Sequence, residues 1–228
     1  MTEIPRIVSA DDHVVEPPDV WASRLPAKYR DVGPRVVRAP VAEMTFRGGT
    51  YAYEMGEEGT LADWWVYEDR AIPHTRLSAC AGFPPEEVQV VPMTYDEMRP
   101  GCHEPGPRLD DMDLNWVEAS LCFPTFPRFC GQTFLEADDR ELALLCVQAY
   151  NDWMVQEWCA GSGGRLVPLC LTPLWDPVLA ASEVRRNAAR GVRAVCFSEL
   201  PTNLGLPSVH DADRHWDPFV AACDETGT

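Results

Sequence analysis

An aspartate and a histidine lie two residues apart at the end of the first apolar segment, as Asp11 and His13. Alternate side chains of a strand point to the same side, so this spacing brings one carboxylate and one imidazole together. Both groups are ligands of divalent metals, and a zinc site needs at least three such groups. The pair therefore predicts half of a divalent-metal site. The alternative is a turn aspartate beside a surface histidine.

The elements around this pair predict an α/β protein. The pattern indicates a first strand over residues 6–13, which the following Pro-Pro pair brings to an end. Further strands are expected over 117–123, 166–171 and 192–197, and helices over 138–159, 177–190 and 217–225. Asp176 before Pro177 predicts a capped helix start. Alternating strands and helices are typical of a parallel sheet, whose strand tips carry the chemistry.

Between the first two strands the sequence makes a long excursion over residues 18–106. Its segment 45–53 alternates in polarity around a Gly-Gly pair, which predicts a β-hairpin. So long a segment is rarely without structure of its own, and in a barrel it would lie over the active face. We therefore expect an ordered lid. Trp64 and Trp65 are expected to form lid core or, alternatively, to line a pocket for an aromatic ligand.

Four more residues near the predicted strand tips are candidates for the site. Glu199 and Arg128 follow two of the strands and are the catalytic candidates, Arg128 as partner of a substrate carboxylate. The alternative for Glu199 is a loop carboxylate without a catalytic role, and the alternative for Arg128 is a surface salt bridge. Glu16 is expected either to orient a loop or metal ligand or to cap the turn before a proline. Asp12 faces away from its two neighbours and is expected to brace the turn.

The remaining histidines, His74, His103, His210 and His215, are scattered and are expected to be structural. His74 lies in the expected lid, where an approach to substrate is the alternative. The sequence has no Gly-x-Ser-x-Gly elbow, which argues against a serine hydrolase. No cysteine stands out from the packing pattern as a nucleophile.

The run from Ser9 to Pro17 resembles the opening of the amidohydrolase-2 family, the decarboxylase-type branch of the amidohydrolase superfamily. Later segments are similar to that family in the same order: 108–113 leading into 117–124, then 165–169, 191–195 and 215–218. The resemblance implies a (β/α)8 barrel of the TIM type, whose first strand ends in two ligands of a zinc or manganese ion. Asp11 and His13 match these two ligands. The family adds a histidine after the fifth strand and an aspartate after the eighth.

The resemblance covers about four strand–helix units, whereas a complete barrel needs about 250 residues or more. We therefore expect the N-terminal half of a barrel, truncated, with the missing ligands and acid/base residues beyond Thr228. The implied activity is a metal-dependent hydrolase of a small organic substrate, in which the metal activates water. The alternative is metal-dependent, non-oxidative decarboxylation of an aromatic or unsaturated carboxylic acid.

A third alternative is a catalytically inactive fragment that acts only by association. An open half-barrel leaves two unpaired sheet edges and an exposed apolar face, and a homo-oligomer is one way to cover them.

Composition narrows the classes of partner. The 228 residues are 46% hydrophobic and carry a net charge of −17, which argues against nucleic acid and against an anionic membrane surface as partners. A small-molecule substrate remains. The nine cysteines include no Cys-x-x-Cys pair, and several lie in apolar runs, where free thiols behave as small core residues. With no signal peptide and no apolar run near 18 residues, this pattern indicates a cytoplasmic protein with reduced thiols.

Overall fold

Parallel strands at the centre of the molecule follow one another in space in the order of the sequence. The computed structural model describes residues 5–228. The strands β1 (Ile7–Val14), β6 (Val117–Pro124) and β7 (Leu166–Val167) form a parallel sheet in that order. A second parallel pair joins β8 (Leu169–Cys170) to β9 (Ala194–Val195). The predicted α/β class and the parallel pairing are confirmed.

Helices follow these strands along the chain. They are α1 (Pro105–Leu114), α2 (Gln132–Leu135), α3 (Arg140–Trp153), α4 (Pro177–Ala188) and α5 (Asp217–Thr226). The capped start of α4 is confirmed, because the Asp176 carboxylate accepts hydrogen bonds from the backbone N–H groups of Val178 (2.8 Å) and Leu179 (3.0 Å). In residues 5–228 no helix combines the length and the apolar character that a membrane crossing requires.

Two predicted strands are shorter in the structure than expected, and a proline explains the first of them. Pro168 has no N–H group, so the segment expected as one strand over 166–171 is divided into β7 and β8. Past β8, the side chain of Asn151 takes over the pairing of Leu171, accepting from its N–H (2.7 Å) and donating to its carbonyl oxygen (2.9 Å). Of the segment predicted over 192–197, two residues pair as β9.

The long predicted helix over 138–159 is also divided. Its α-helical part ends at Trp153, and the chain continues as a π-helix over Met154–Trp158. The π-helix is wider than an α-helix, which the spacing of apolar residues did not indicate.

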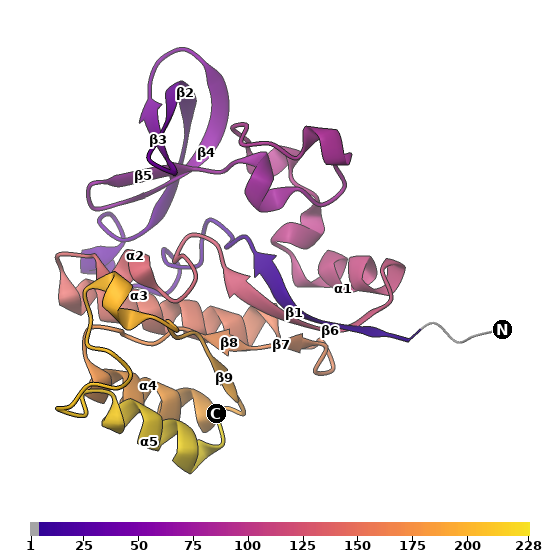
Figure 1. Cartoon of the computed structure of the whole chain (residues 1–228). Coiled ribbons are helices and arrows are strands. Elements are labelled where there is room, and N and C mark those ends of the chain that lie inside the picture. Colours follow the sequence, from indigo (N-terminus) through magenta and orange to yellow (C-terminus); the bar gives the residue numbers. More distant parts are fainter. Residues whose placement is uncertain (1–4) are drawn as a thin grey trace.

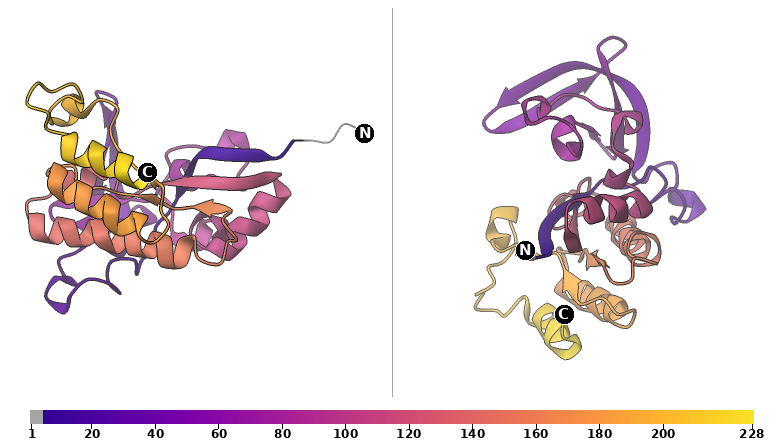
Figure 2. Two further views of the ribbon diagram at one scale, coloured as in Figure 1. Left: turned by 90° about the horizontal axis from the view of Figure 1, so that it is seen from below. Right: turned by 90° about the vertical axis from the view of Figure 1, so that its right-hand side faces the viewer.

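The excursion between β1 and β6 folds around an antiparallel sheet of its own. It contains β2 (Arg35–Arg47), β3 (Thr50–Met55), β4 (Thr60–Tyr67) and β5 (Arg70–Pro73), in the order β3-β2-β4-β5. The predicted hairpin is confirmed: β2 and β3 pair across Gly48 and Gly49, whose φ angles of 59° and 86° fit a tight turn. This sheet lies on the opposite side of the parallel strands from α4 and α5 (Figure 1, Figure 2). Short 3-10 turns occur at Ala27–Tyr29, Arg76–Ala79, Pro85–Glu87, Tyr95–Glu97, Pro100–Cys102 and Pro201–Leu204.

The excursion shares an aromatic core with the parallel strands. Trp65 of β4 packs edge-on against Trp21, with ring centres 4.9 Å apart, and stacks on Phe126 at 5.0 Å. Trp64 is fully buried against the antiparallel sheet itself. Both tryptophans are therefore core residues, and the alternative that they line a ligand pocket is wrong.

Candidate functional site

The tip of β1 opens into a cavity of about 820 Å³, and both predicted metal ligands line it. The parallel pairing of β1 with β6 places His13 opposite Phe123. The pairing register shifts between Ser9 and Asp12, an irregularity of the kind that re-aims side chains next to functional sites. Asp11 and His13 are both exposed and line this cavity. Asp12, which the alternation of the strand placed on the opposite side, lines it as well.

The side chains of these two residues are free, unlike that of the residue between them. Within residues 5–228, no hydrogen bond or ion pair forms at the Asp11 carboxylate or the His13 ring, and His13 bonds through its backbone oxygen. The Asp12 carboxylate instead accepts a hydrogen bond from the Ser120 hydroxyl of β6. Asp12 thus braces the neighbouring strand rather than its own turn, and Asp11 and His13 remain available to a ligand.

The donor atoms of this pair suit a divalent metal, but two donors are too few to form a closed metal site. Carboxylate oxygen and imidazole nitrogen suit zinc and manganese alike. The part of the chain that the structure describes holds no group of three or more His, Cys, Asp or Glu residues able to surround a metal ion. Asp11 and His13 therefore supply two donors, and a closed site needs at least a third. The metal site stays a prediction.

An arginine of α1 fixes the tip of β1. The Arg108 guanidinium donates to the backbone oxygen of His13 (2.5 Å) and to that of Gly101 (2.8 Å), and lies 3.9 Å from the Asp12 carboxylate. Its side chain is 16% exposed. Arg108 is a positioning residue that the sequence reasoning missed, because 95 residues separate it from His13 and no local pattern joins them.

Glu16 has the orienting role, one of the two expected for it. Its carboxylate is fully buried and accepts hydrogen bonds from the backbone N–H groups of Thr125 (2.9 Å) and Phe126 (3.0 Å), just past β6. Burial raises the pKa of Glu16 to about 7, although these backbone hydrogen bonds oppose the rise. The loop after β6, which carries cavity residue Thr125, is thereby fixed to the loop after β1.

Arg128 reaches the cavity, whereas Glu199 does not. Arg128 follows β6 with a φ of 62°, and its Nη1 donates to the Glu136 carboxylate at 2.8 Å while half of its side chain stays exposed. It lines the same cavity as Asp11 and His13. Beside it, Phe129 stacks on Phe123 with ring centres 4.6 Å apart. Glu199 is exposed and lies outside the lining of this cavity, so its expected catalytic role gains no support.

Part of the cavity wall comes from the excursion between β1 and β6. Segment 77–82, Arg99 and Cys102 contribute to the lining. Arg99 pairs with Asp111 of α1, its Nε donating to the carboxylate at 2.7 Å, and this pairing lowers the pKa of Asp111. The cavity thus contains three guanidinium groups, which offset its three carboxylates.

The other titratable residues have structural surroundings. Burial lowers the pKa of His74 to about 4, and its Nε2 lies 3.0 Å from the Tyr95 hydroxyl, which donates to the backbone oxygen of Glu16 at 2.6 Å. None of the four other histidines lines the large cavity, as expected of structural residues. Burial also raises the pKa values of the core thiols, to about 11 for Cys130 and about 12 for Cys170, which disfavours a thiolate nucleophile.

The fold agrees with the comparisons with known proteins. The sequence profile of the amidohydrolase family matches residues 11–228, and the chain belongs to this family. Comparison with curated proteins finds no match.

Two solved structures are similar to the chain. An amidohydrolase from Mycobacterium avium subsp. paratuberculosis K-10 is 23% identical with a TM-score of 0.63, over 98% of this chain and 57% of that one. A 2,6-dihydroxybenzoate decarboxylase from Rhizobium is 14% identical with a TM-score of 0.47, over 98% of this chain and 48% of that one. The chain therefore spans about half the length of these structures.

Proposed function

We propose that this chain carries part of the active site of a metal-dependent hydrolase that acts on a small organic molecule. One observation carries the proposal. Asp11 and His13 lie free of other partners, within the described residues, at the tip of a parallel strand and in a cavity of about 820 Å³. A carboxylate and an imidazole in this position suit zinc or manganese.

The fold belongs to the same proposal. We infer that β1, β6, the β7–β8 segment and β9 are the first four strands of a (β/α)8 barrel, with the excursion over 18–106 as its lid. The strands are neighbours in space in the same order as they follow one another in the sequence, which supports this view. The likeness to a longer amidohydrolase supports it as well. The residues at the strand tips would then face the reaction, as they do in barrels of this type.

The residues of the chain have distinct roles in this proposal. A bound divalent metal lowers the pKa of water and polarises a scissile carbonyl group. Asp11 and His13 hold the metal, and Arg108 keeps their strand tip in place. Arg128 presents a guanidinium to a substrate carboxylate, and Phe129, which stacks on Phe123, offers an apolar surface to the body of the substrate. The excursion supplies the lid side of the cavity wall, including Cys102.

Decarboxylation is the second candidate, and the same cavity supports it. An exposed guanidinium at Arg128 beside the stacked rings of Phe123 and Phe129 suits a flat carboxylic acid. Asp11 and His13 would again hold the metal. The two candidates differ in product, because only decarboxylation releases carbon dioxide from the substrate.

Metal binding tests the proposal directly. The 228-residue chain is titrated with Zn²⁺ or Mn²⁺ by calorimetry, together with Asp11→Ala and His13→Ala. We expect each variant to weaken binding at least about tenfold. His210→Ala, which removes an exposed imidazole outside the cavity, is the matched control and should bind as the parent does. Parent protein that binds no metal, or binding that survives both alanine substitutions, would refute the role of the pair.

A further inference from the structure

A second, smaller cavity of about 490 Å³ lies beside α2 and shares one residue, Arg128, with the large cavity. Its walls come from the loops that follow β6, β8 and β9, and from the start of α3. Asp11 and His13 do not line it. The second cavity therefore borders the proposed active site without belonging to it.

Two guanidinium groups give this cavity a positive side in a strongly acidic chain. Arg140 is fixed in place: its Nη1 donates to the backbone oxygens of Phe134 (3.3 Å) and Leu135 (2.6 Å), and the group lies 5.2 Å from the ring centre of Trp175. Arg128 donates through Nη1 to Glu136. A guanidinium has five N–H donors, and in residues 5–228 the Nε and Nη2 groups of both arginines make no hydrogen bond. These donors are available to an anion.

Apolar side chains form another part of the cavity wall. Leu135 is buried in the main core, and Trp175, Leu204 and Leu206 are partly buried against it. An inorganic anion would leave this surface uncovered. A ligand with a carboxylate at one end and an apolar body at the other would use both sides of the cavity.

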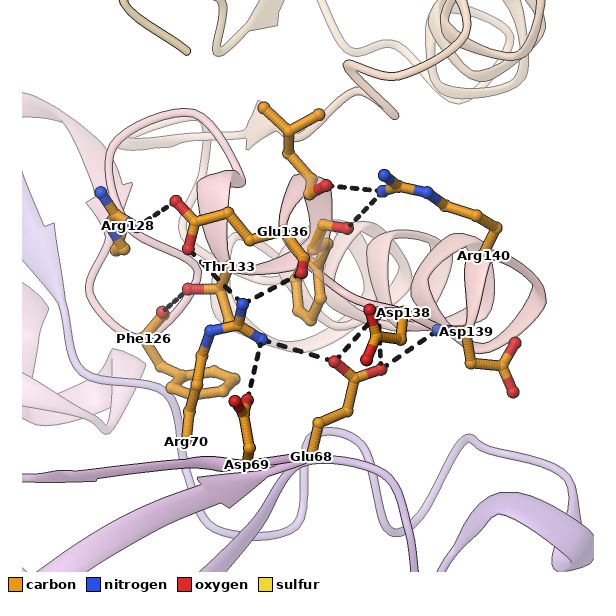
Figure 3. A network of polar contacts seen from close by, with 12 residues as sticks. Glu68, Asp69, Arg70, Phe126, Arg128, Thr133, Glu136, Asp138, Asp139 and Arg140 are labelled. Atoms are coloured by element: carbon orange, nitrogen blue, oxygen red, sulfur yellow. Dashed lines mark hydrogen bonds and ion pairs between the residues drawn. The ribbon is translucent and has the colours of Figure 1, made fainter. Parts of the chain in front are cut away.

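Glu136 already presents a carboxylate to this site and lies between the two arginines (Figure 3). It accepts from Arg128, and Arg70 of β5 donates to its backbone oxygen at 3.0 Å, with the Glu136 carboxylate 3.7 Å away. Arg70 also pairs with Glu68. Glu68 and Arg128 both have positive φ angles, 51° and 62°, which residues other than glycine seldom adopt. Both residues belong to one ionic network that also contains Arg70 and Glu136.

We propose that the second cavity binds a small organic carboxylate with an apolar body, whose carboxylate competes with Glu136 for Arg128 and pairs with Arg140. The bidentate geometry of guanidinium suits such a carboxylate. The apolar body rests against Trp175 and Leu204. The proposal does not depend on the proposed metal ligands, because neither Asp11 nor His13 takes part in it. Arg128 lines both cavities, so Arg140, which lines the second cavity and not the large one, distinguishes the two sites.

Cyclohexanecarboxylate is the probe, and cyclohexanecarboxamide is its uncharged control. Binding to the 228-residue chain is followed by calorimetry. We expect saturable binding of the acid that Arg140→Gln weakens about tenfold and that added salt weakens further. Glu136→Gln is expected to tighten binding several-fold, because it removes the competing carboxylate. A purely structural role for Glu136 would not predict tighter binding. His13→Ala should bind as the parent does, and thermal unfolding of each variant verifies that it is folded.

Several results would overturn this proposal. They are the absence of saturable binding in the millimolar range, equal binding of the amide, unchanged affinity in Arg140→Gln, or weaker binding in Glu136→Gln. Loss of binding in His13→Ala would place the probe in the large cavity instead. If the chain binds the probe but neither Zn²⁺ nor Mn²⁺, only the proposed enzyme function is refuted.

Discussion

Replacing Glu16 with glutamine should remove a loss of stability that the parent protein suffers as the pH rises. The carboxyl group is fully buried and is held by two backbone N–H groups, those of Thr125 and Phe126. No basic side chain within residues 5–228 bonds to it. Burial disfavours the ionised form, which is why the pKa of Glu16 rises from 4.5 to about 7. Between these two values the folded chain retains a proton that the unfolded chain has released.

The sign and size of the effect follow from this difference. A raised carboxyl pKa means that the stability present below pH 4.5 is lost as the pH passes through about 7. The whole window corresponds to roughly 3 kcal/mol, at about 1.4 kcal/mol for each pKa unit. Between pH 5 and pH 8 the part belonging to Glu16 is roughly 2.5 kcal/mol. Glutamine cannot ionise, so the stability of Glu16→Gln relative to the parent should rise by that amount.

Urea unfolding of both proteins at pH 5 and pH 8 measures this double difference. Other titrating groups, His74 among them, affect both proteins alike and cancel. Glu16→Ala should show the same change in relative stability with pH. Its free energy of unfolding should also be much lower at every pH, because the substitution leaves two buried N–H groups without acceptors. Parallel stability curves for parent and glutamine variant across this range would refute the raised pKa of Glu16.

Two further contacts give predictions that thermal or urea unfolding can check. Asn151→Ala should lower the free energy of unfolding by roughly 2–4 kcal/mol, because the buried N–H and C=O groups of Leu171 lose their hydrogen-bond partner. A decrease below about 1 kcal/mol would contradict this prediction. Glu68→Ala should lower the free energy of unfolding by about 1–2 kcal/mol. In the parent, the Glu68 carboxylate accepts hydrogen bonds from the backbone N–H groups of Asp138 (3.0 Å) and Asp139 (3.2 Å), just before α3. Asp69→Ala is the matched control, because Asp69 lies in the same turn and is exposed. An equal decrease in the free energy of unfolding for this variant would contradict the stabilising role of the Glu68 hydrogen bonds.

Features that depend on a few neighbouring residues were predictable from the sequence. The hairpin at Gly48 and Gly49 and the cap at Asp176 each follow from the conformation of one short segment, and the structure has both. The division of the third strand was also within reach, because Pro168 lies in its middle and cannot donate to a ladder. The alternating apolar pattern outweighed that signal.

Features that depend on distant contacts were not predictable. Arg108 binds the backbone of His13 from another element, and its side chain type does not reveal that partner. The burial of Glu16 is a similar case, since a glutamate before two prolines is ordinarily a solvated turn residue. Its partners at Thr125 and Phe126 lie more than a hundred residues along the chain. Sequence pattern therefore indicated the proposed pair of metal ligands but not the residues that hold its surroundings in place.

What distinguishes Asp11 from the carboxylates around it is the lack of a structural partner. Asp12 accepts from Ser120, Glu16 accepts from two backbone N–H groups, and Glu136 pairs with Arg128. Each of these groups has its hydrogen-bonding capacity directed to a donor that fixes the fold. The Asp11 carboxylate has no such donor in the described residues, although it lies in a cavity beside an equally free imidazole. A carboxylate that stabilises nothing in the fold, held in place by neighbours that do, is what a ligand site requires before its ligand arrives.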